Sequence, residues 1–453
     1  MTPLSFEDPV HALSRFTDAQ AMGEVWRARL PALLRRPFEF ESCNVQYARC
    51  RTYLNPQSWH KSFLCVCYEF DGATQCDGTY KPMLYGRAYL DGRSQREFAA
   101  LNHLDGAQHL PDLDMIVWPF PNDPKLPQLL ELLDSDRVID HFPYAEMPFA
   151  RGAIVGVKTT VIRYRPEQRC ILRYDIEYGS QRNQYVLYAK VFADDNGVGV
   201  FSRMQRCYDL ADVIAARVAR PLGYSATTGA VWQEELRGEP LVAALDAGRY
   251  DLSVAAIGHC LARLHAADVP TDRLVTREAR LDDATKKSQK LAQLLPALDG
   301  PLAALIACAD SDLTNLAPAP TAVIHGDVHV GQFLLTPDGA LALFDFDEWS
   351  QGDPAQDLAD LIVDLQVVMS TCAKAKMNHV RSANVANVLL ASYRADAAWP
   401  VSDETILWHA RIQVINKAYR TAIQQEPDWC EKVLALIAIA TRGIDLGIRR
   451  GSP

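Results

Sequence analysis

The chain has 453 residues, of which 49% are hydrophobic and 23% are charged, an ordinary composition for a folded protein. This length exceeds the usual size of one hydrophobic core, so we expect two or three domains. The formal net charge of −10 argues against nucleic acid or an anionic membrane as the main partner. No hydrophobic run approaches the roughly 20 residues of a membrane-spanning helix, and no secretory signal is visible. The sequence therefore favours a cytoplasmic protein and leaves its oligomeric state open.

Eleven cysteines are scattered along the chain. Cys65 and Cys67 form the only close pair in the sequence, and no second pair at zinc-ligand spacing accompanies them. We therefore expect reduced, structural thiols.

Three regions follow one another along the chain. Residues 1–148 begin with a helical segment, become rich in predicted strands and end in the proline-rich run WPFPNDPKLP. Residues 149–240 contain VKTTVIRY, RCILRYDIEY and YVLYAKVF, whose β-branched and aromatic residues predict strands. In residues 241–453 the hydrophobic period becomes helical, as in AAIGHCLARLHAAD and DLADLIVDLQ. These patterns predict an α+β fold in which a mixed α+β region precedes a β-rich region and a helical region.

The first two regions resemble each other. An apolar strand, a turn, an aromatic-rich strand and then YGRAY in the first region parallel the same succession ending in YAKVF in the second. Arg87 and Lys190 take the same place in this succession, at an offset of 103 residues (190 minus 87). Two interpretations remain open: any two β-meanders look alike, or a small β-rich lobe is duplicated and only its second copy is catalytic. Under duplication we expect the first copy to cap the second and Arg87 to have no part in ligand binding.

Residues 323–347 read VIHGDVHVGQFLLTPDGALALFDFD. FLL and ALALF are short strand-like runs, and TPDG between them has the residues of a tight turn. Such a hairpin brings its outer ends together, so we expect Asp327, Gln332 and Asp345 to converge. Carboxylate and amide oxygens beside a loop suit Mg²⁺, which takes further ligands from phosphate and water.

Three spaced motifs resemble the aminoglycoside phosphotransferase and choline kinase family. They are HGDVHVGQ at 325–332, DFD at 345–347 and GDPAQDLA at 352–359. The resemblance covers about residues 155–450. It implies a protein-kinase-like fold of two lobes and ATP-dependent phosphorylation of a hydroxyl on a small molecule.

The resemblance also implies roles for the motif residues. Phosphoryl transfer needs positioning and charge neutralisation more than covalent chemistry, and Asp327 is placed to orient the attacking hydroxyl and accept its proton. Asp345 would hold Mg²⁺, and Gln332 would be a second ligand. We expect His325, also assigned to the catalytic loop, to shape that loop by hydrogen bonding, and Asp357 to brace it.

Gln332 departs from the family, because most relatives carry Asn there. Gln offers the same amide oxygen on a stem that is one methylene longer. The version HGDxHxGQ resembles the branch that includes maltokinases and bacterial glucosamine kinases. Members of that branch carry an extra N-terminal cap domain, and the resemblance implies an α+β cap domain at residues 1–148, before the kinase-like N-lobe at 149–240 and the helical C-lobe at 241–453. Gln332 thus favours a sugar or an amino sugar as the acceptor.

The sequence signals for nucleotide binding are weaker than those for the catalytic loop. The hairpin YRPEQR contains no glycine-rich motif, so phosphate contacts are expected from Arg165 or Arg169. Lys190 stands where the fold places the strand lysine that pairs with the α- and β-phosphates, although an edge lysine that reaches solvent is an alternative. WQEELRGEPL resembles the hinge that reads adenine, which assigns Glu235 and Leu236 to nucleotide binding.

Acceptor candidates adjoin the catalytic motifs. They are His329, Asp347, Glu348 and Trp349. An acidic site with one tryptophan suits a cationic or sugar-like ligand, although each acid could equally cap a turn or a helix. Asp353, before the helix PAQDLADLI, is predicted to be an N-cap.

Two other functions are alternatives to a small-molecule kinase. A kinase-like regulatory protein that binds nucleotide or a metabolite without transfer is favoured by the glycine-poor hairpin and by Gln332. Intact Asp327, Asp345 and Lys190 oppose it. A protein kinase is disfavoured because the sequence has no HRD or APE motif.

Overall fold

The structure is a computed structural model of the chain. It describes residues 9–51, 58, 61–73, 81–101, 106–247, 251–269, 271, 273–371 and 379–441. The chain divides into two compact units. The first comprises Met1–Phe201, Pro221–Glu235 and Arg420–Cys430, and the second comprises Ser202–Arg220, Leu236–Tyr419 and Glu431–Pro453.

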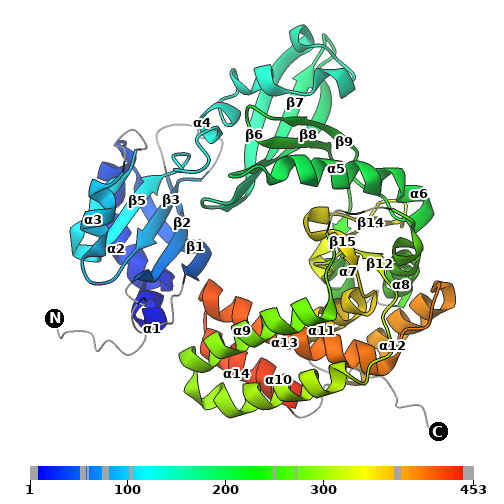
Figure 1. The fold of residues 1–453 in the computed structure, drawn as a ribbon. Helices are drawn as coiled ribbons and strands as arrows, with labels where there is room; N and C mark the ends of the chain where they lie inside the picture. The colour runs from blue at the N-terminus through cyan, green and yellow to red at the C-terminus, as the bar shows by residue number, and fades with distance from the viewer. Residues whose placement is uncertain are drawn as a thin grey trace. The chain divides into compact units, whose positions relative to one another are not determined.

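The first unit contains a five-stranded antiparallel sheet, here called the N-terminal sheet, with the strand order β1-β2-β3-β5-β4 (Figure 1). Its strands are β1 (Glu39–Arg51), β2 (Phe63–Ala73), β3 (Met83–Ala88), β4 (Gln108–Leu110) and β5 (Met115–Pro119). The short helices α1 (Pro9–Ser14) and α3 (Arg93–Ala99) and the longer α2 (Ala19–Leu34) accompany it.

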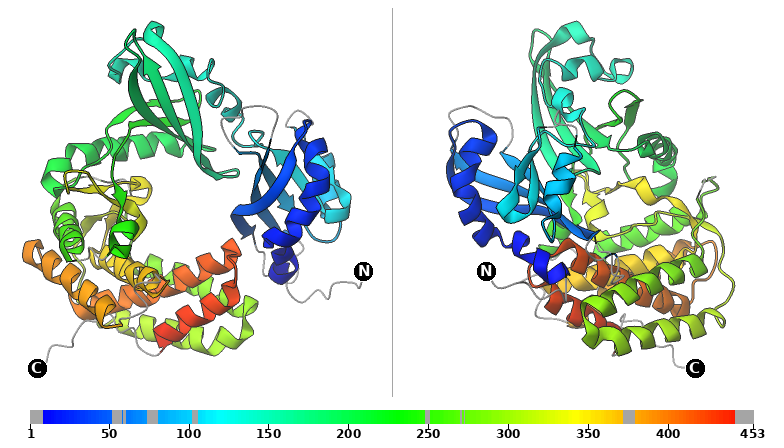
Figure 2. Two further views of the ribbon diagram at one scale, coloured as in Figure 1. Left: turned by 180° about the vertical axis from the view of Figure 1, so that it is seen from behind. Right: turned by 60° about the vertical axis from the view of Figure 1, so that its left-hand side comes forward.

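Helix α2 lies on one face of the N-terminal sheet (Figure 2). Asp18 caps its first turn by accepting hydrogen bonds from the backbone N–H groups of Gln20 and Ala21, both at 3.0 Å. Trp26 on the inner face of the helix is fully buried, and its ring centroid lies 5.1 Å from that of Tyr68 on β2. This aromatic packing fixes the helix to the sheet.

A second five-stranded antiparallel sheet, here called the lobe sheet, has the order β6-β7-β8-β10-β9. Its strands are β6 (Ile154–Arg165), β7 (Arg169–Tyr178), β8 (Asn183–Phe192), β9 (Pro221–Ser225) and β10 (Ala230–Glu234). Helix α5 (Asn196–Asp209) and the single turn α6 (Ala211–Ile214) connect β8 to β9.

The two sheets share one strand order. In each, three consecutive strands form a meander, a helical segment follows, and the fifth strand pairs with the third. This common topology supports the hypothesis of a duplicated lobe, because two unrelated meanders have no reason to insert the last strand at the same place.

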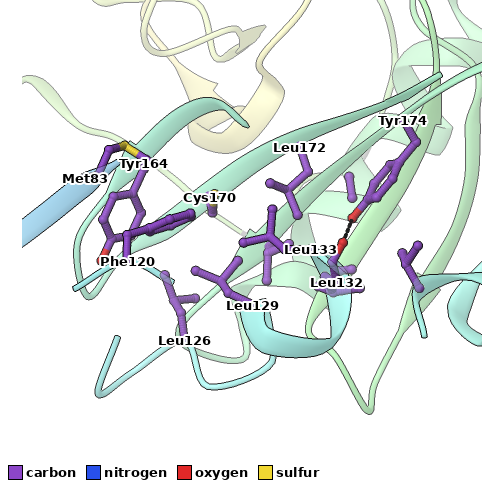
Figure 3. Close-up of a cluster of buried hydrophobic side chains, with 14 of the residues drawn as sticks. Met83, Phe120, Leu126, Leu129, Leu132, Leu133, Tyr164, Cys170, Leu172 and Tyr174 are labelled. Carbon is purple, nitrogen blue, oxygen red and sulfur yellow. Dashed lines mark hydrogen bonds between the residues drawn. The ribbon is translucent and has the colours of Figure 1, made fainter. Parts of the chain in front are cut away.

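The two sheets also share a hydrophobic core. The segment between them contains α4 (Leu129–Leu132), and its apolar side chains pack with residues of both sheets. Figure 3 shows Met83 of the N-terminal sheet near Phe120 and Tyr164, with Leu126 and Leu129 beyond them. The predicted boundary between residues 148 and 149 thus lies inside the first unit, and the division into a cap domain and a lobe stays a prediction.

The second unit is mostly helical. Its longer helices, some of which extend into the first unit, are α8 (Asp251–Ala266), α9 (Arg277–Leu294), α10 (Asp299–Leu313), α11 (Ala355–Thr371), α12 (His379–Asp396), α13 (Asp403–Gln424) and α14 (Trp429–Thr441). The helical turn α7 (Leu241–Asp246) precedes them. No described helix has the length and hydropathy needed to cross a membrane.

Two small antiparallel sheets sit among these helices. One joins β11 (Glu239–Pro240), β13 (Phe333–Leu335) and β14 (Leu341–Leu343), and the other joins β12 (Ala322–Ile324) to β15 (Ser350–Gly352). The cysteines that the structure describes are free thiols and most are buried, as expected for structural cysteines. The predicted α+β class is confirmed by these sheets and helices.

Candidate active site

The hairpin predicted from the sequence is present. Phe333 pairs with Leu343 and Leu335 with Leu341, and the N–H of Thr336 donates to the carbonyl of Ala340 at 2.9 Å. Gly339 in the turn has a φ of 80°, a left-handed conformation that glycine adopts without strain. The two outer ends of the hairpin are therefore adjacent.

The catalytic loop (residues 325–332) begins where β12 ends, and Asp357 on α11 holds it. The carboxylate of Asp357 accepts hydrogen bonds from the backbone N–H groups of His325 at 2.7 Å and Gly326 at 3.0 Å. Gly326 has a φ of 83°, and a Cβ there would collide with the carbonyl of Glu348. The predicted brace by Asp357 is confirmed.

Asp357 is fully buried and has a further partner. It lies 3.1 Å from Nε2 of His265 on α8, and Nδ1 of that histidine is 2.9 Å from the hydroxyl of Tyr393 on α12. Burial raises the pKa of Asp357, but the hydrogen bond to His265 and the neighbouring donors outweigh this and lower it. The brace is thus an ionised carboxylate on α11 that contacts His265 of α8, and that histidine in turn contacts Tyr393 of α12.

His325 links the catalytic loop to the second acidic loop. Its ring is fully buried, and Nε2 donates to the carbonyl of Phe344 at 3.1 Å, immediately before Asp345. A buried ring tied to a backbone carbonyl is suited to shaping the loop, as expected, and not to exchanging protons with a substrate.

Gln332 and Asp345 are in contact at the open end of the hairpin. The amide nitrogen of Gln332 donates to Oδ2 of Asp345 at 3.3 Å, and the N–H of Phe344 donates to the carbonyl of Gln332 at 3.2 Å. Asp345 has a φ of 67°, which a non-glycine residue adopts only where its surroundings stabilise it. The predicted convergence of these two residues is therefore present.

This pair is chemically suited to Mg²⁺. Magnesium binds through one or two protein oxygens and completes its octahedron with phosphate and water. Here the Asp345 carboxylate lies beside the Gln332 amide, which would present its oxygen in place of its nitrogen after a half-turn about its terminal bond. Among the residues that the structure describes, no group of three or more His, Cys, Asp or Glu side chains could hold a metal by itself.

Asp327 lies in the catalytic loop, half-buried, between β12 and the short 3₁₀ helix η9 (Val330–Gln332). The pKa of Asp360 on α11 is raised to about 6, mainly by burial, which outweighs the lowering effect of Arg280; the charges of Asp357 and Asp327 also contribute to the rise. Asp360 accepts from the guanidinium of Arg280, with an NH2–Oδ1 distance of 2.5 Å. On its helical side the catalytic loop is therefore close to acidic side chains, whose charge Arg280 partly neutralises.

Two further contacts fix the end of the catalytic loop. The N–H of Val330 donates to Asp364 at 2.9 Å, and the same carboxylate pairs with Lys417 on α13. The Nδ1 atom of His329 accepts from the N–H of Gly331 at 3.0 Å and so caps η9. His329, an acceptor candidate, thus has at least one structural role.

The other acceptor candidates are placed differently. Asp347 and Glu348 lie in the 3₁₀ helix η10 (Phe346–Glu348) that follows the hairpin, and Glu348 forms an exposed ion pair with Arg273. Trp349 is only 2% exposed and packs against Phe346, with ring centroids 5.9 Å apart. The structure places this indole in the core beneath the loop, where it supports the fold.

Asp353 is the predicted N-cap of α11. Its Oδ1 accepts from the N–H of Ala355 at 2.9 Å, while Oδ2 accepts from Arg277 at 2.6 Å and lies 3.1 Å from Nε2 of His409. Burial raises the pKa of Asp353, but the hydrogen bond to His409 and the charge of Arg277 lower it to about 2. Burial lowers the pKa of His409 to about 4, so its ring is neutral and donates to Asp353.

The nucleotide candidates belong mainly to the first unit. Lys190 lies half-buried on β8, which pairs with both β7 and β10, so the alternative of an edge lysine is wrong. Its Nζ atom lies 5.5 Å from the ring centroid of Phe192. Arg165 and Arg169 pair across the turn of the β6–β7 hairpin.

The hinge candidates follow β10. Glu235 pairs with Arg173, at an NH1–Oε1 distance of 3.2 Å, and Leu236 is the next residue. The division between the two compact units falls between these two residues. A connection at this point is compatible with the hinge assignment, which stays a prediction.

The sequence-based reasoning missed several supporting residues. These are His265, Arg280, Asp360, Asp364 and Lys417. The acids were detectable, because positions 353, 357, 360 and 364 recur with the period of one helix face. Their basic partners lie on three other helices, α8, α9 and α13, so no pattern close in the sequence links them to these acids.

The antiparallel sheet, the helical region and the braced aspartate loops define a kinase-like α+β protein. Residues 180–403 match the family described as the phosphotransferase enzyme family. This match confirms, for these residues, the family assignment predicted from the three motifs.

Other similarities are more limited. A stretch of 110 residues is 36% identical to an uncharacterised protein of Deinococcus radiodurans, and it covers 23% of this chain and 32% of that protein. The chain therefore matches about a third of the length of that relative.

Among solved structures, a choline/ethanolamine kinase family protein from Mesorhizobium loti is similar with 17% identity and a TM-score of 0.46, over 67% of this chain and 93% of that one. An aminoglycoside-3'-phosphotransferase of type VIII is similar with 20% identity and a TM-score of 0.40, over 56% of this chain and 92% of that one.

Proposed function

We propose that this protein transfers the γ-phosphoryl group of ATP to a hydroxyl of a small molecule, a sugar or an amino sugar. The observation that carries the proposal is the joined pair of loops, in which Asp357 and His325 fix the catalytic loop and tie it to the loop of Asp345. Phosphoryl transfer depends on such pre-set positions, because the protein contributes mainly orientation and charge.

Within this proposal, Asp327 orients the acceptor hydroxyl and receives its proton as the oxygen attacks phosphorus. Its loop is held at the N-terminal end by Asp357 and at the C-terminal end by Asp364. Both contacts use backbone N–H groups, so the loop keeps its conformation whatever acceptor enters. The aspartate can then act without a costly rearrangement.

Asp345 and Gln332 would hold Mg²⁺ at the open end of the hairpin, where the catalytic loop ends. When bound, the ion neutralises charge on the phosphate oxygens. Lys190 would pair with the α- and β-phosphates, and the hinge at Glu235 and Leu236 would receive the adenine through backbone groups. Arg165 and Arg169 flank the turn of the hairpin and would contact the phosphates.

The catalytic motifs leave carboxylates beside the loop that suit a hydroxyl-rich acceptor. Asp347 and Glu348 in η10 are not buried, unlike the Asp360–Arg280 pair, whose groups satisfy each other inside the protein. Carboxylates accept hydrogen bonds from the hydroxyls of a sugar and from the ammonium of an amino sugar. A small polar acceptor without a membrane or nucleic acid partner also agrees with the acidic net charge.

The experiment is a turnover assay with Mg-ATP against a panel of sugars, amino sugars, amino alcohols and aminoglycosides, followed by ADP release. We expect one chemical class to stimulate release well above the hydrolysis seen without an acceptor. The matched control is Asp327→Asn, which preserves shape and removes the proton acceptor. Nucleotide binding without turnover on any acceptor would instead favour a kinase-like regulatory protein.

A further inference from the structure

The turn of the β6–β7 hairpin is embedded in the N-terminal sheet. Glu167 at its tip is 7% exposed, and its carboxylate accepts from Nε of Arg87 on β3 at 2.5 Å. A second guanidinium nitrogen of Arg87 and the hydroxyl of Tyr85 also reach the same carboxylate. Lys125 stands 3.7 Å from the other carboxylate oxygen. A charged residue at the tip of a hairpin would normally be solvated, so this burial is a specific contact.

Backbone contacts secure the same turn. The N–H of Glu167 donates to Oδ2 of Asp123 at 2.8 Å, and the hydroxyl of Tyr164 donates to that oxygen at 2.6 Å. Glu167 has a φ of 59°, an uncommon conformation for a residue other than glycine. The turn therefore holds a backbone conformation that its contacts with the N-terminal region stabilise.

The next residue of the turn is also anchored. The side-chain oxygen of Gln168 accepts from Arg49 at 3.2 Å, and its amide nitrogen donates to the hydroxyl of Tyr47 at 2.5 Å. Both partners lie on β1. Two successive residues of the hairpin are thus bound to two different strands of the N-terminal sheet.

Arg87 stands in a notable position for this contact. It takes the place in the N-terminal sheet that Lys190 takes in the lobe sheet: the third strand of the same strand order, paired on both sides. The sequence alone predicted no part for Arg87 in nucleotide binding. The contact with Glu167 changes that expectation, because Glu167 lies between the two arginines assigned to the phosphates.

We propose that the N-terminal sheet positions the phosphate-binding hairpin of the lobe sheet, with Arg87 as the positioning residue and Glu167 as its partner. The hairpin has no glycine-rich loop to wrap around phosphates, so Arg165 and Arg169 must be presented in a fixed geometry instead. Anchoring residues 167 and 168 between them fixes their backbone. This inference rests on the proposed function, since the ligand of the hairpin is taken to be the triphosphate of ATP.

The test combines two measurements on the full chain. Hydrogen–deuterium exchange of residues 163–170 without nucleotide reports whether the pair holds the hairpin. The KM for ATP and kcat report whether that matters for phosphate binding. The variants are Arg87→Met, Glu167→Gln and the double variant, which leaves no uncompensated buried charge and therefore keeps the test valid if a single variant fails to fold. The control is Arg29→Met, which breaks the exposed pair with Asp112 in the same region.

We expect exchange in the hairpin to accelerate about tenfold in all three variants. The KM for ATP should rise about tenfold while kcat changes by less than about threefold. Because both residues belong to one contact, the double variant should show less than the sum of the two single effects. Arg29→Met should match the wild type in both measurements.

Three outcomes would overturn the proposal. Unchanged exchange would show that the pair does not hold the hairpin, and faster exchange with an unchanged KM would show that its position does not serve the nucleotide. A lower KM would show that the contact restrains binding. If the wild type bound no nucleotide, the proposed function would fail together with the positioning role, while exchange would still report whether Arg87 holds the hairpin.

Discussion

The brace of the catalytic loop gives a quantitative prediction. Asp357 is fully buried and has contacts with three donors: the N–H groups of His325 and Gly326 and the ring of His265. Asp357→Ala leaves these groups without this partner, and a buried unsatisfied donor costs about 1–3 kcal/mol. Allowing for water that enters the vacated space, we expect a loss of roughly 4 kcal/mol. This is a large part of the roughly 5–15 kcal/mol that stabilises a typical folded protein.

Asp357→Asn refines the same prediction. It keeps the shape and one oxygen but turns an amide NH₂ toward groups that themselves donate, so we expect a loss of about 2 kcal/mol and a large fall in turnover. Because the pKa of Asp357 is lowered in the fold, its contribution is present above about pH 4 and is lost as the pH falls further. The difference in the free energy of unfolding between the wild type and the variant should therefore be smaller at pH 3 than at pH 7.

The assay is urea unfolding of wild type and variants at pH 7 and pH 3, with hydrogen–deuterium exchange across residues 322–332 to locate the effect. The control is Asp282→Asn, which removes an exposed ion pair within α9 and should unfold as the wild type does. If Asp357→Asn unfolded at the wild-type urea concentration and kept wild-type turnover, the loop would not depend on this carboxylate and the reasoning would be refuted.

Three further predictions concern individual side chains. Gln332→Ala should raise the Mg²⁺ concentration needed for turnover, whereas Gln332→Asn should be partly tolerated; equal Mg²⁺ dependence in all three proteins would exclude Gln332 as a ligand. Lys190→Ala should weaken ATP binding about tenfold or more in calorimetry, and unchanged affinity would remove it from the nucleotide site. His409 has a pKa of about 4 in the fold and about 6.5 when unfolded. As the pH is lowered from about 6.5 to about 4 the unfolded chain therefore binds a proton before the folded chain does, and the free energy of unfolding falls by about 3 kcal/mol. His409→Gln should lack this fall when urea midpoints are compared at pH 7.5 and 4.5, and a parallel fall in both proteins would contradict the assignment.

The part of the site that could be predicted from the sequence is local. A tight turn between two short apolar runs fixes a hairpin, so Gln332 and Asp345 could be placed together without knowledge of the rest of the fold. Short-range patterns determine such geometry directly. Asp357 lies 32 residues from His325, and its role as a brace was predicted from the resemblance of the GDPAQDLA motif to the family instead.

The contacts that could not be predicted join distant segments. Arg87 and Glu167 are 80 residues apart, and neither position has a pattern that specifies the other. The sequence showed the likeness between the two β-rich regions but not that one would bind the turn of the other. Trp349 was assigned to the acceptor because it adjoins an acidic motif, yet its burial depends on how Phe346 and the core pack around it.

The central claim is that Asp327 acts on an acceptor hydroxyl in transfer from ATP. The most direct measurement is ³¹P NMR of the wild type and of Asp327→Asn, each with Mg-ATP and the best acceptor of the panel, after calorimetry has shown that both bind the nucleotide. The account predicts that the wild type converts the γ-phosphate signal into that of a phosphate monoester, whereas the variant binds ATP and forms no ester. Ester formation by Asp327→Asn at the wild-type rate would contradict it.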